Sequence, residues 1–185
     1  MEMFRSTKDG GASVWLSVGE ATLLRTLLVP VMELLGEGSG SRSGKPVDVI
    51  DDLESAFTDE QPPVPDDPVL ARLLPDAYRD DPAASGEFRK YTESSLRESK
   101  KYFAQTMLDT LPPTGGRVKL TGDQARDWLR ALNDVRLMFG VRLEVTEDFE
   151  DQLAAMDPGD PKVAAFEVYG WLGAVQESLV QALAR

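Results

Sequence analysis

Basic side chains gather between positions 89 and 101 of a chain whose net charge is −12. One interpretation is a positively charged surface that contacts nucleic acid or an acidic partner helix. The other is a solvated helix face held by ion pairs such as Glu93–Arg97, which is the more common case. Both interpretations stay open, and the candidate partner-binding residues are Arg89, Lys90, Arg97, Lys100 and Lys101.

A second polar group interrupts the strongly apolar segment 128–143. At helical spacing Asp134 lies one turn from Arg130, and Asn133 lies one turn from Arg136. We favour a buried polar network that ties together two repeated segments of the chain, described below, because buried polar groups must find partners. A recognition surface is the alternative. The candidate residues are Arg130, Asn133, Asp134 and Arg136.

Composition removes most catalytic chemistry. The chain has no cysteine and no histidine, which excludes disulfides, thiolate metal sites and Ser-His-Asp or Cys-His catalysis within it. Acidic pairs such as Asp51-Asp52 and Asp66-Asp67 lack the spacing of a calcium loop. No glycine-rich nucleotide pattern occurs. We therefore predict a non-enzymatic protein with no catalytic residue, no metal site and no cofactor.

The overall charge also bears on partners and location. Acidic residues outnumber basic ones 32 to 20, which disfavours direct binding to DNA or to an anionic membrane. The longest apolar stretch, Leu23–Leu35, is interrupted by Arg25, Pro30 and Glu33 and is too short to span a bilayer. We expect a cytoplasmic protein that binds another protein. The sequence leaves its oligomeric state open.

Some of the strands and helices that must position these residues belong to an internal duplication. A shift of 104 positions places residues 14–36 on residues 118–140 without a gap. Each copy predicts a strand, a capping box, an amphipathic helix and a glycine stop. The two boxes are Ser17-x-x-Glu20 and Thr121-x-x-Gln124. Pro30 in the first copy should kink or split its helix.

Other patterns complete the expected fold. Asp9-Gly10-Gly11 predicts a hairpin between strands at 4–8 and 13–18, which the strand 117–120 should join. Helices are expected at 47–57, 68–74, 82–111 and after Asp160-Pro161, and a short helix within the acidic stretch 144–160. The result is a mainly α fold with a small antiparallel sheet (α+β), in which a helical bundle packs on about three strands.

The domain prediction is a single domain over residues 1–185. Within it, residues 36–66 are expected to form a flexible acidic and proline-rich connector, because GEGSGSRSGKP and QPPVPDDP have linker composition. The long helix 82–111 should bury an apolar side made of Phe88, Tyr91, Leu96, Phe103, Met107 and Leu111.

Several blocks of the chain together resemble an actinobacterial family of unknown function. They are LSVGEATLLRTLL, PDDPVLARLLPDAYRDDP, EFRKYTESSL, WLRALNDVRLMFGVRLEVTED and VYGWLGAVQESLV. Genes of this family often lie beside that of the Clp protease adaptor ClpS, and some members are described as AosR-type oxidative-stress transcriptional regulators. The resemblance implies contact with a sigma factor or RNA polymerase, and oxidant sensing through a cysteine pair.

This chain departs from that pattern, since it has no cysteine. Regulation through protein contacts is compatible with its composition, whereas thiol sensing is not. The function expected is transcription regulation by contact with a sigma factor or RNA polymerase. Two alternatives remain open: an accessory factor of Clp-dependent proteolysis, and a carboxylate-based enzyme with paired acids in a closed pocket.

Overall fold

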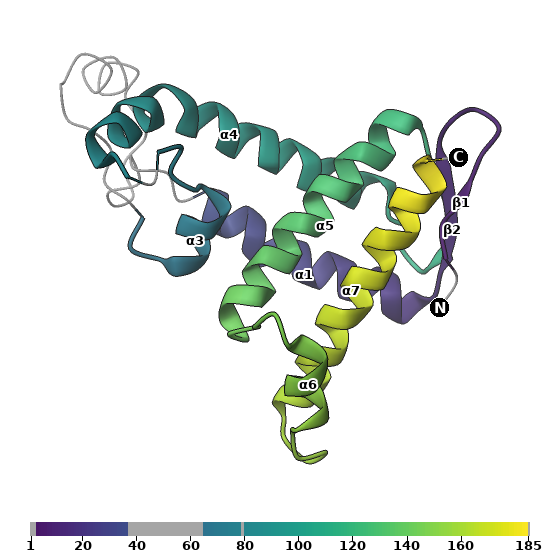
Figure 1. The fold of residues 1–185 in the computed structure, drawn as a ribbon. Coiled ribbons are helices and arrows are strands. Elements are labelled where there is room, and N and C mark those ends of the chain that lie inside the picture. The colour runs from purple at the N-terminus through teal and green to yellow at the C-terminus, as the bar shows by residue number, and fades with distance from the viewer. Residues whose placement is uncertain (1–2, 37–64, 79, 185) are drawn as a thin grey trace.

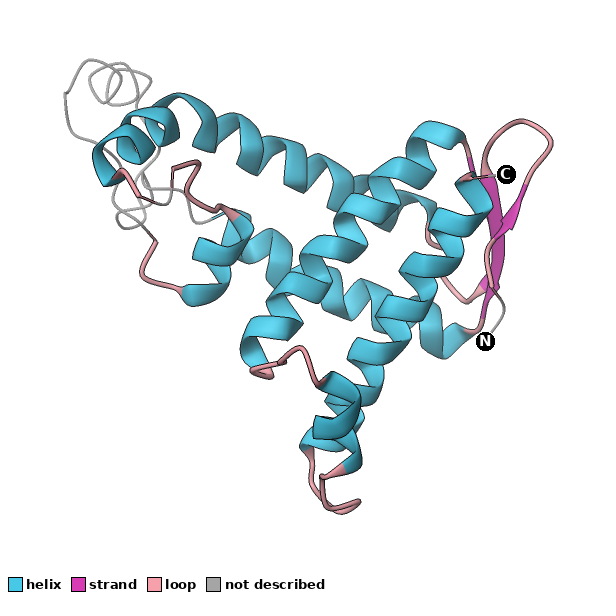
Figure 2. Ribbon diagram, viewed as in Figure 1, coloured by secondary structure: helices cyan, strands magenta, loops and turns pink. Residues whose placement is uncertain are grey.

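The fold is a set of helices packed on one small sheet (Figures 1 and 2). The computed structural model describes residues 3–36, 65–78 and 80–184. The predicted connector at 36–66 and the predicted helix at 47–57 therefore lie mostly or wholly outside the described residues. In chain order the elements are β1 (Arg5–Ser6), β2 (Ala12–Leu16), α1 (Val18–Gly36), α3 (Pro68–Leu73), α4 (Pro82–Thr110), β3 (Gly116–Leu120), α5 (Gly122–Arg142), α6 (Phe149–Ala154) and α7 (Lys162–Leu183).

The sheet has three antiparallel strands in the order β1-β2-β3, as the hairpin and the duplication predict. The hairpin turn contains Gly10 at φ 72°, a left-handed conformation that glycine adopts at no steric cost. Strand β1 is shorter than the predicted 4–8. The mainly α fold with a small antiparallel sheet is confirmed.

The pairing of β2 with β3 places equivalent residues of the two copies opposite each other. Val14 pairs with Val118, its equivalent in the other copy. On either side of this pair, Ser13 pairs with Lys119 and Trp15 pairs with Arg117. Replacing each residue by its equivalent in the other copy turns one of these two pairs into the other. The two strands are therefore paired symmetrically about Val14 and Val118. Each strand then leads into its own long helix, α1 or α5.

Both predicted capping boxes form with nearly the same geometry. The backbone N–H of Ser17 donates to Glu20 Oε2 at 2.8 Å, and that of Glu20 donates to Ser17 Oγ at 3.2 Å. The corresponding distances for Thr121 and Gln124 are 3.0 and 3.2 Å. Helix α1 is not split at Pro30, since helical structure runs on to Gly36.

The core is a single cluster of buried residues from the sheet and the helices, and it runs from Phe4 to Ala182 in the sequence. Helix α5 crosses its centre and contacts α1, α3, α4 and α7. Its Trp128 is fully buried, lies edge-on to Phe4 at 5.9 Å between ring centroids, and donates its indole N–H to Thr110 Oγ1 at 2.8 Å. Burying so large an aromatic side chain with its one polar group satisfied is strongly favourable.

Helix α4 corrects one prediction about the core. Met107 and Leu111 are buried, as expected, but Phe88, Tyr91 and Leu96 are exposed. The buried side of the first half of α4 carries Arg89 and Arg97 instead. Residues one or two positions apart point to different sides of a helix, so burying the arginines turns the aromatic residues outward.

Aspartates begin the remaining helices much as the sequence predicts. Asp67 accepts hydrogen bonds from the backbone N–H groups of Val69 and Leu70, and Asp81 accepts one from Ala84. Ahead of α7, Asp160 accepts one from the N–H of Lys162 at 2.8 Å. Helix α6 is the short helix expected in the acidic stretch. Among the described residues, no helix has the length and apolar character needed to cross a membrane.

Candidate functional site: charge networks inside α4 and α5 and an aromatic face outside

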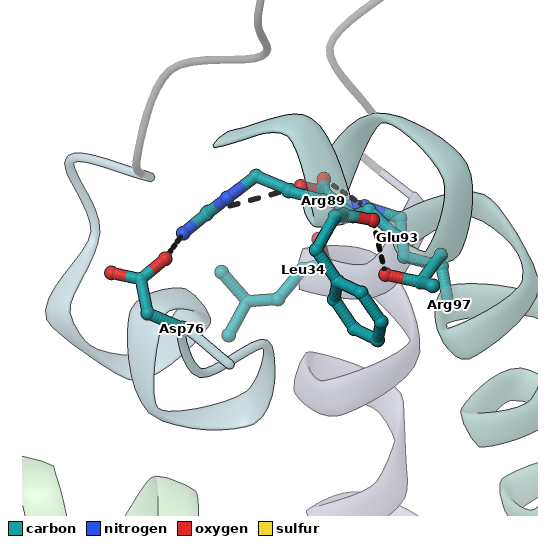
Figure 3. A network of polar contacts seen from close by, with 7 residues as sticks. Leu34, Asp76, Arg89, Glu93 and Arg97 are labelled. Carbon is teal, nitrogen blue, oxygen red and sulfur yellow. Dashed lines mark hydrogen bonds and ion pairs between the residues drawn. The ribbon is translucent and has the colours of Figure 1, made fainter. Parts of the chain in front are cut away.

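The first charge network joins α4 to the segment after α3 and to the end of α1 (Figure 3). Arg89 pairs with Asp76, and its Nη1 lies 3.9 Å from Glu93 Oε2. Glu93 also binds Arg97, at 2.7 Å from Nη2 and 2.8 Å from Nε. Glu93 thus lies between two arginines, one helical turn away on either side.

Arg97 also reaches the last turn of α1. Its Nη1 lies 3.4 Å from the carbonyl oxygen of Leu34 and 3.5 Å from that of Leu35, which makes two long hydrogen bonds. Carbonyl groups at the end of a helix have no partner within the helix and carry partial negative charge, so a cation there is stabilising. Arg97 therefore fastens the end of α1 to α4.

These contacts correct the predicted basic surface. Arg89 and Arg97 are 6% and 7% exposed, so neither is available to a partner, and Lys100 is bound to an aspartate in the interior. Lys90 and Lys101 are half-buried. The ion-paired interpretation holds for Glu93–Arg97, but the paired face is buried rather than solvated. Arg89, Arg97 and Lys100 therefore hold α4 against its neighbours.

The second charge network is centred on Asp134 of α5. Its Oδ1 lies 2.6 Å from Lys100 Nζ of α4, and its side chain is 3% exposed. Burial raises the pKa of the Asp134 carboxyl above its ordinary value, although the hydrogen bond and the charge of Lys100 act in the opposite direction. The desolvation of this carboxylate is therefore only partly offset by its ion pair.

The other polar residues of α5 do not form one network with Asp134. Arg130 pairs with Asp127 at 3.1 Å and its guanidinium lies 4.8 Å from the Phe103 ring centroid. Arg136 donates to Gln176 Oε1 of α7 at 2.8 Å. Asn133 is exposed. Among the described residues, Asp134 and Arg136 bind α4 and α7 in place of the neighbours suggested by helical spacing, and these contacts do not join the two copies.

Sequence reasoning missed an exposed aromatic face on α4. Phe88, Tyr91 and Tyr102 are 47%, 73% and 61% exposed, and helical spacing puts them on one side of the helix. Leu96, 37% exposed, borders this side, and Tyr78 lies edge-on to Phe88 at 6.2 Å between ring centroids. We call these five residues the α4 aromatic face.

A groove runs beside the α4 aromatic face. It has a volume of about 340 Å³ and lies between α4 and the segment that follows α3. Leu74 and Pro75 line one wall, and Phe88 and Leu96 line the other.

The spacing of the charged residues in α4 is the sequence signal that could have predicted the exposed aromatic face. Arg89, Glu93 and Arg97 repeat every four residues, so they share one helix side and form a linked set that leaves the opposite side to the aromatic residues.

Two acids also line this groove, Asp76 and Glu93, and both are bound to Arg89. Among the described residues, no group of three or more acidic side chains is arranged to hold a metal ion. The arrangement can bind an apolar or aromatic surface.

Comparison with known proteins places the chain in a family. Residues 1–183 match the domain of unknown function DUF2017, and the chain belongs to this family. It is 36% identical over 182 residues to a protein of Mycobacterium tuberculosis named oxidative stress regulator AosR, covering 91% of this chain and 80% of that protein. It is also 36% identical over 177 residues to a Mycobacterium leprae protein named putative oxidative stress regulator AosR, covering 89% and 78%. No solved structure is similar.

Proposed function

We propose that this protein is a non-enzymatic regulator of the oxidative-stress response that acts by contact with a sigma factor or RNA polymerase. Relatives named as oxidative stress regulators support the regulatory role. The observation that carries the mode of action is the α4 aromatic face. Exposed aromatic residues beside an apolar groove are typical of protein-binding surfaces, since tyrosine and phenylalanine bury large areas with few rotatable bonds.

The chemistry of the chain limits how it takes part in such a response. No cysteine is present to form a disulfide or a sulfenic acid, so this chain cannot sense an oxidant through a thiol. In the proposed mechanism the oxidant signal reaches the complex through the partner or through the amount of protein present. The role of this chain is then to bind that partner.

The charge of the chain favours a basic partner surface. Its net charge of −12 repels nucleic acid, which argues against direct DNA binding. The cations that could have formed a nucleic-acid surface on α4 are largely used inside the fold, since Arg89, Arg97 and Lys100 all bind acidic side chains. A partner with an apolar patch surrounded by lysine and arginine would fit the α4 aromatic face.

The test is binding of the full chain to purified RNA polymerase and to individual sigma factors from an actinobacterium with a member of this family. Tyr91→Ala and Phe88→Ala should each weaken binding by about tenfold or more, because truncating a central aromatic hot spot costs about 2 kcal/mol or more. Trp15→Ala is the matched control. Trp15 is 52% exposed and lies on β2, at the end of the molecule opposite α3 (Figure 1).

Absence of binding to polymerase and to every sigma factor would exclude this mechanism. Equal weakening by Tyr91→Ala and Trp15→Ala would place the contact elsewhere on the protein. Binding to purified Clp subunits in place of polymerase, with the same sensitivity to Tyr91→Ala, would instead support an accessory role in Clp-dependent proteolysis.

A further inference from the structure

A second pocket, of about 340 Å³, is lined by residues outside the α4 aromatic face. They come mainly from α3, α5 and α7, and α3 and α7 both pack on α5. Figure 1 labels these three helices. The polar lining of the pocket consists of Arg72 from α3, Asn133 and Arg136 from α5, and Tyr169 from α7. Leu137 and Val141 contribute apolar surface. The volume suits a small molecule, at the lower end of the range for ligand pockets.

The charge of this pocket is opposite to that of the whole protein. Two arginines line it, and the described residues that line it include no aspartate or glutamate. Within the described part of the chain, neither Arg72 nor Arg136 is paired with a carboxylate, although acidic residues outnumber basic ones 32 to 20 in the full sequence. Two unneutralised guanidinium groups in one concavity attract an anion.

Packing holds the Arg136 side chain in place, but not all of its N–H donors have a hydrogen-bond acceptor. Its guanidinium lies 5.1 Å from the Tyr169 ring centroid and against Gly173, where an added Cβ would come 3.7 Å from Cζ. Of its five N–H donors, the one interaction found is from Nη1 to Gln176, and the buried Nε has no acceptor among the described residues. Packing thus fixes the orientation of this side chain and leaves guanidinium donors without a protein acceptor among the described residues.

Neither arginine is needed to hold the fold by a charge contact, in contrast to the arginines of α4. Arg89 and Arg97 each bind a carboxylate, whereas Arg72 is exposed and has no hydrogen bond or ion pair with another described residue. Arg72 and Arg136 come from different helices and line the same pocket. A planar guanidinium is suited to bidentate binding of carboxylate or phosphate oxygens.

We propose that this pocket binds a small anionic metabolite, with a carboxylate or phosphate group held between Arg72 and Arg136 and an apolar portion lying against Leu137 and Val141. Asn133 and the Tyr169 hydroxyl supply further hydrogen bonds to the same molecule. The site is separate from the α4 aromatic face. It would make the protein a ligand-binding regulator, whichever partner it contacts.

The test is isothermal titration calorimetry of the full chain in a phosphate-free, low-salt buffer. The probes are inorganic phosphate, phenyl phosphate and benzoate, with benzyl alcohol as a neutral analogue. We expect binding of at least one aromatic anion and none of benzyl alcohol. The stronger of phenyl phosphate and benzoate identifies the anionic group that the pocket prefers.

Two variants locate the binding. Arg72→Gln should weaken it by about tenfold or more, since hydrogen bonds to charged groups contribute at least that much. Arg72 is exposed, so its replacement leaves the fold intact. The matched control is Arg117→Gln, which removes an exposed arginine from β3 outside the pocket and should leave binding unchanged.

A third variant tests the shape of the pocket. A Cβ at Gly140 would lie 3.9 Å from Tyr169 Cε2, an ordinary contact, so Gly140→Ala is expected to fold and to occupy space in the pocket. It should weaken phenyl phosphate more than inorganic phosphate. No binding of any of the three anions at millimolar concentration, equal binding of benzyl alcohol, or equal weakening by Arg72→Gln and Arg117→Gln would each overturn the proposal.

Discussion

Helices α1 and α5 occupy equivalent places in the two copies of one segment, yet their side chains differ in polarity at several positions. Their strands pair symmetrically, their capping boxes match within about 0.2 Å, and the core positions Leu28 and Leu132 are both buried. Leu23, Thr26, Val29, Pro30 and Met32 of the first copy correspond to Asp127, Arg130, Asn133, Asp134 and Arg136 of the second.

The difference runs against simple expectation, since the more polar helix is the more central one. Helix α5 contacts four other helices, whereas α1 contacts α4 and α5. A central apolar helix could pack against its neighbours in several ways. Lys100 on α4 donates to Asp134 of α5, and Gln176 on α7 accepts from Arg136 of α5, so these contacts favour a single arrangement. The two segments thus share strand pairing and cap geometry, whereas the polar residues of the second bind α4 and α7.

Breaking the contact between α4 and α5 should have the largest effect. Lys100→Met leaves Asp134 buried without its cation, and we expect a loss of about 3–5 kcal/mol in the free energy of unfolding at neutral pH. Urea denaturation followed by circular dichroism measures it. The double variant Lys100→Met with Asp134→Leu is the control and should recover most of the loss. If the single variant is near neutral, water must already reach Asp134.

Truncating equivalent core leucines compares the packing of the two copies. Leu28 and Leu132 are 1% and 0% exposed, so Leu28→Ala and Leu132→Ala should each cost about 2–5 kcal/mol. The two losses should be similar, because both leucines are fully buried at the same position along their helices. Thermal and urea unfolding give the values. A cost in one helix alone would show that the copies do not share a core.

Removing the caps tests the start of each copy. Ser17→Ala and Thr121→Ala should each cost about 1 kcal/mol, since each removes one of two reciprocal hydrogen bonds. Ser6→Ala, in the short edge strand β1, is a control outside any cap. Costs that differ several-fold between the copies would mean that matching geometry does not give matching energetics here.

Sequence patterns predicted the parts of the fold that depend on local rules. Capping boxes, the Asp9-Gly10-Gly11 turn and the aspartates before α3 and α4 involve residues close in the chain, and each formed. The third strand was predictable because the duplication related it to the first copy. These features need no knowledge of which helices become neighbours.

The candidate site depends on long-range packing and was predicted only in part. The basic residues of α4 were recognised, but their burial follows from Asp76, Leu34 and Asp134, which are distant in sequence. Amphipathic reasoning assigns aromatic residues to the core, and here it turned α4 the wrong way. The proposed anion-binding pocket has both Arg72 and Arg136 in its lining, a combination that no local pattern specifies.

The pH dependence of the free energy of unfolding tests a smaller effect, the contribution of the buried Asp134 to stability. Because the pKa of this carboxyl is raised in the folded state above its ordinary 3.8, the folded protein binds more protons than the unfolded one between the two values. The contribution of Asp134 is therefore most favourable below the unfolded pKa and is lost as pH rises through the folded pKa.

Asp134→Asn isolates this contribution, since it keeps the shape of the side chain and removes its titration. The stability of the wild type relative to Asp134→Asn should fall as pH increases from the ordinary aspartate pKa upward, and then level off. Urea unfolding of both proteins across acidic and neutral pH measures the difference, which cancels all other carboxylates. If the wild type instead gains stability relative to the variant, attraction to Lys100 outweighs desolvation. The ion pair would then stabilise the fold as well as select the neighbour of α5, a role for which the first copy, with Pro30 at this position, has no counterpart.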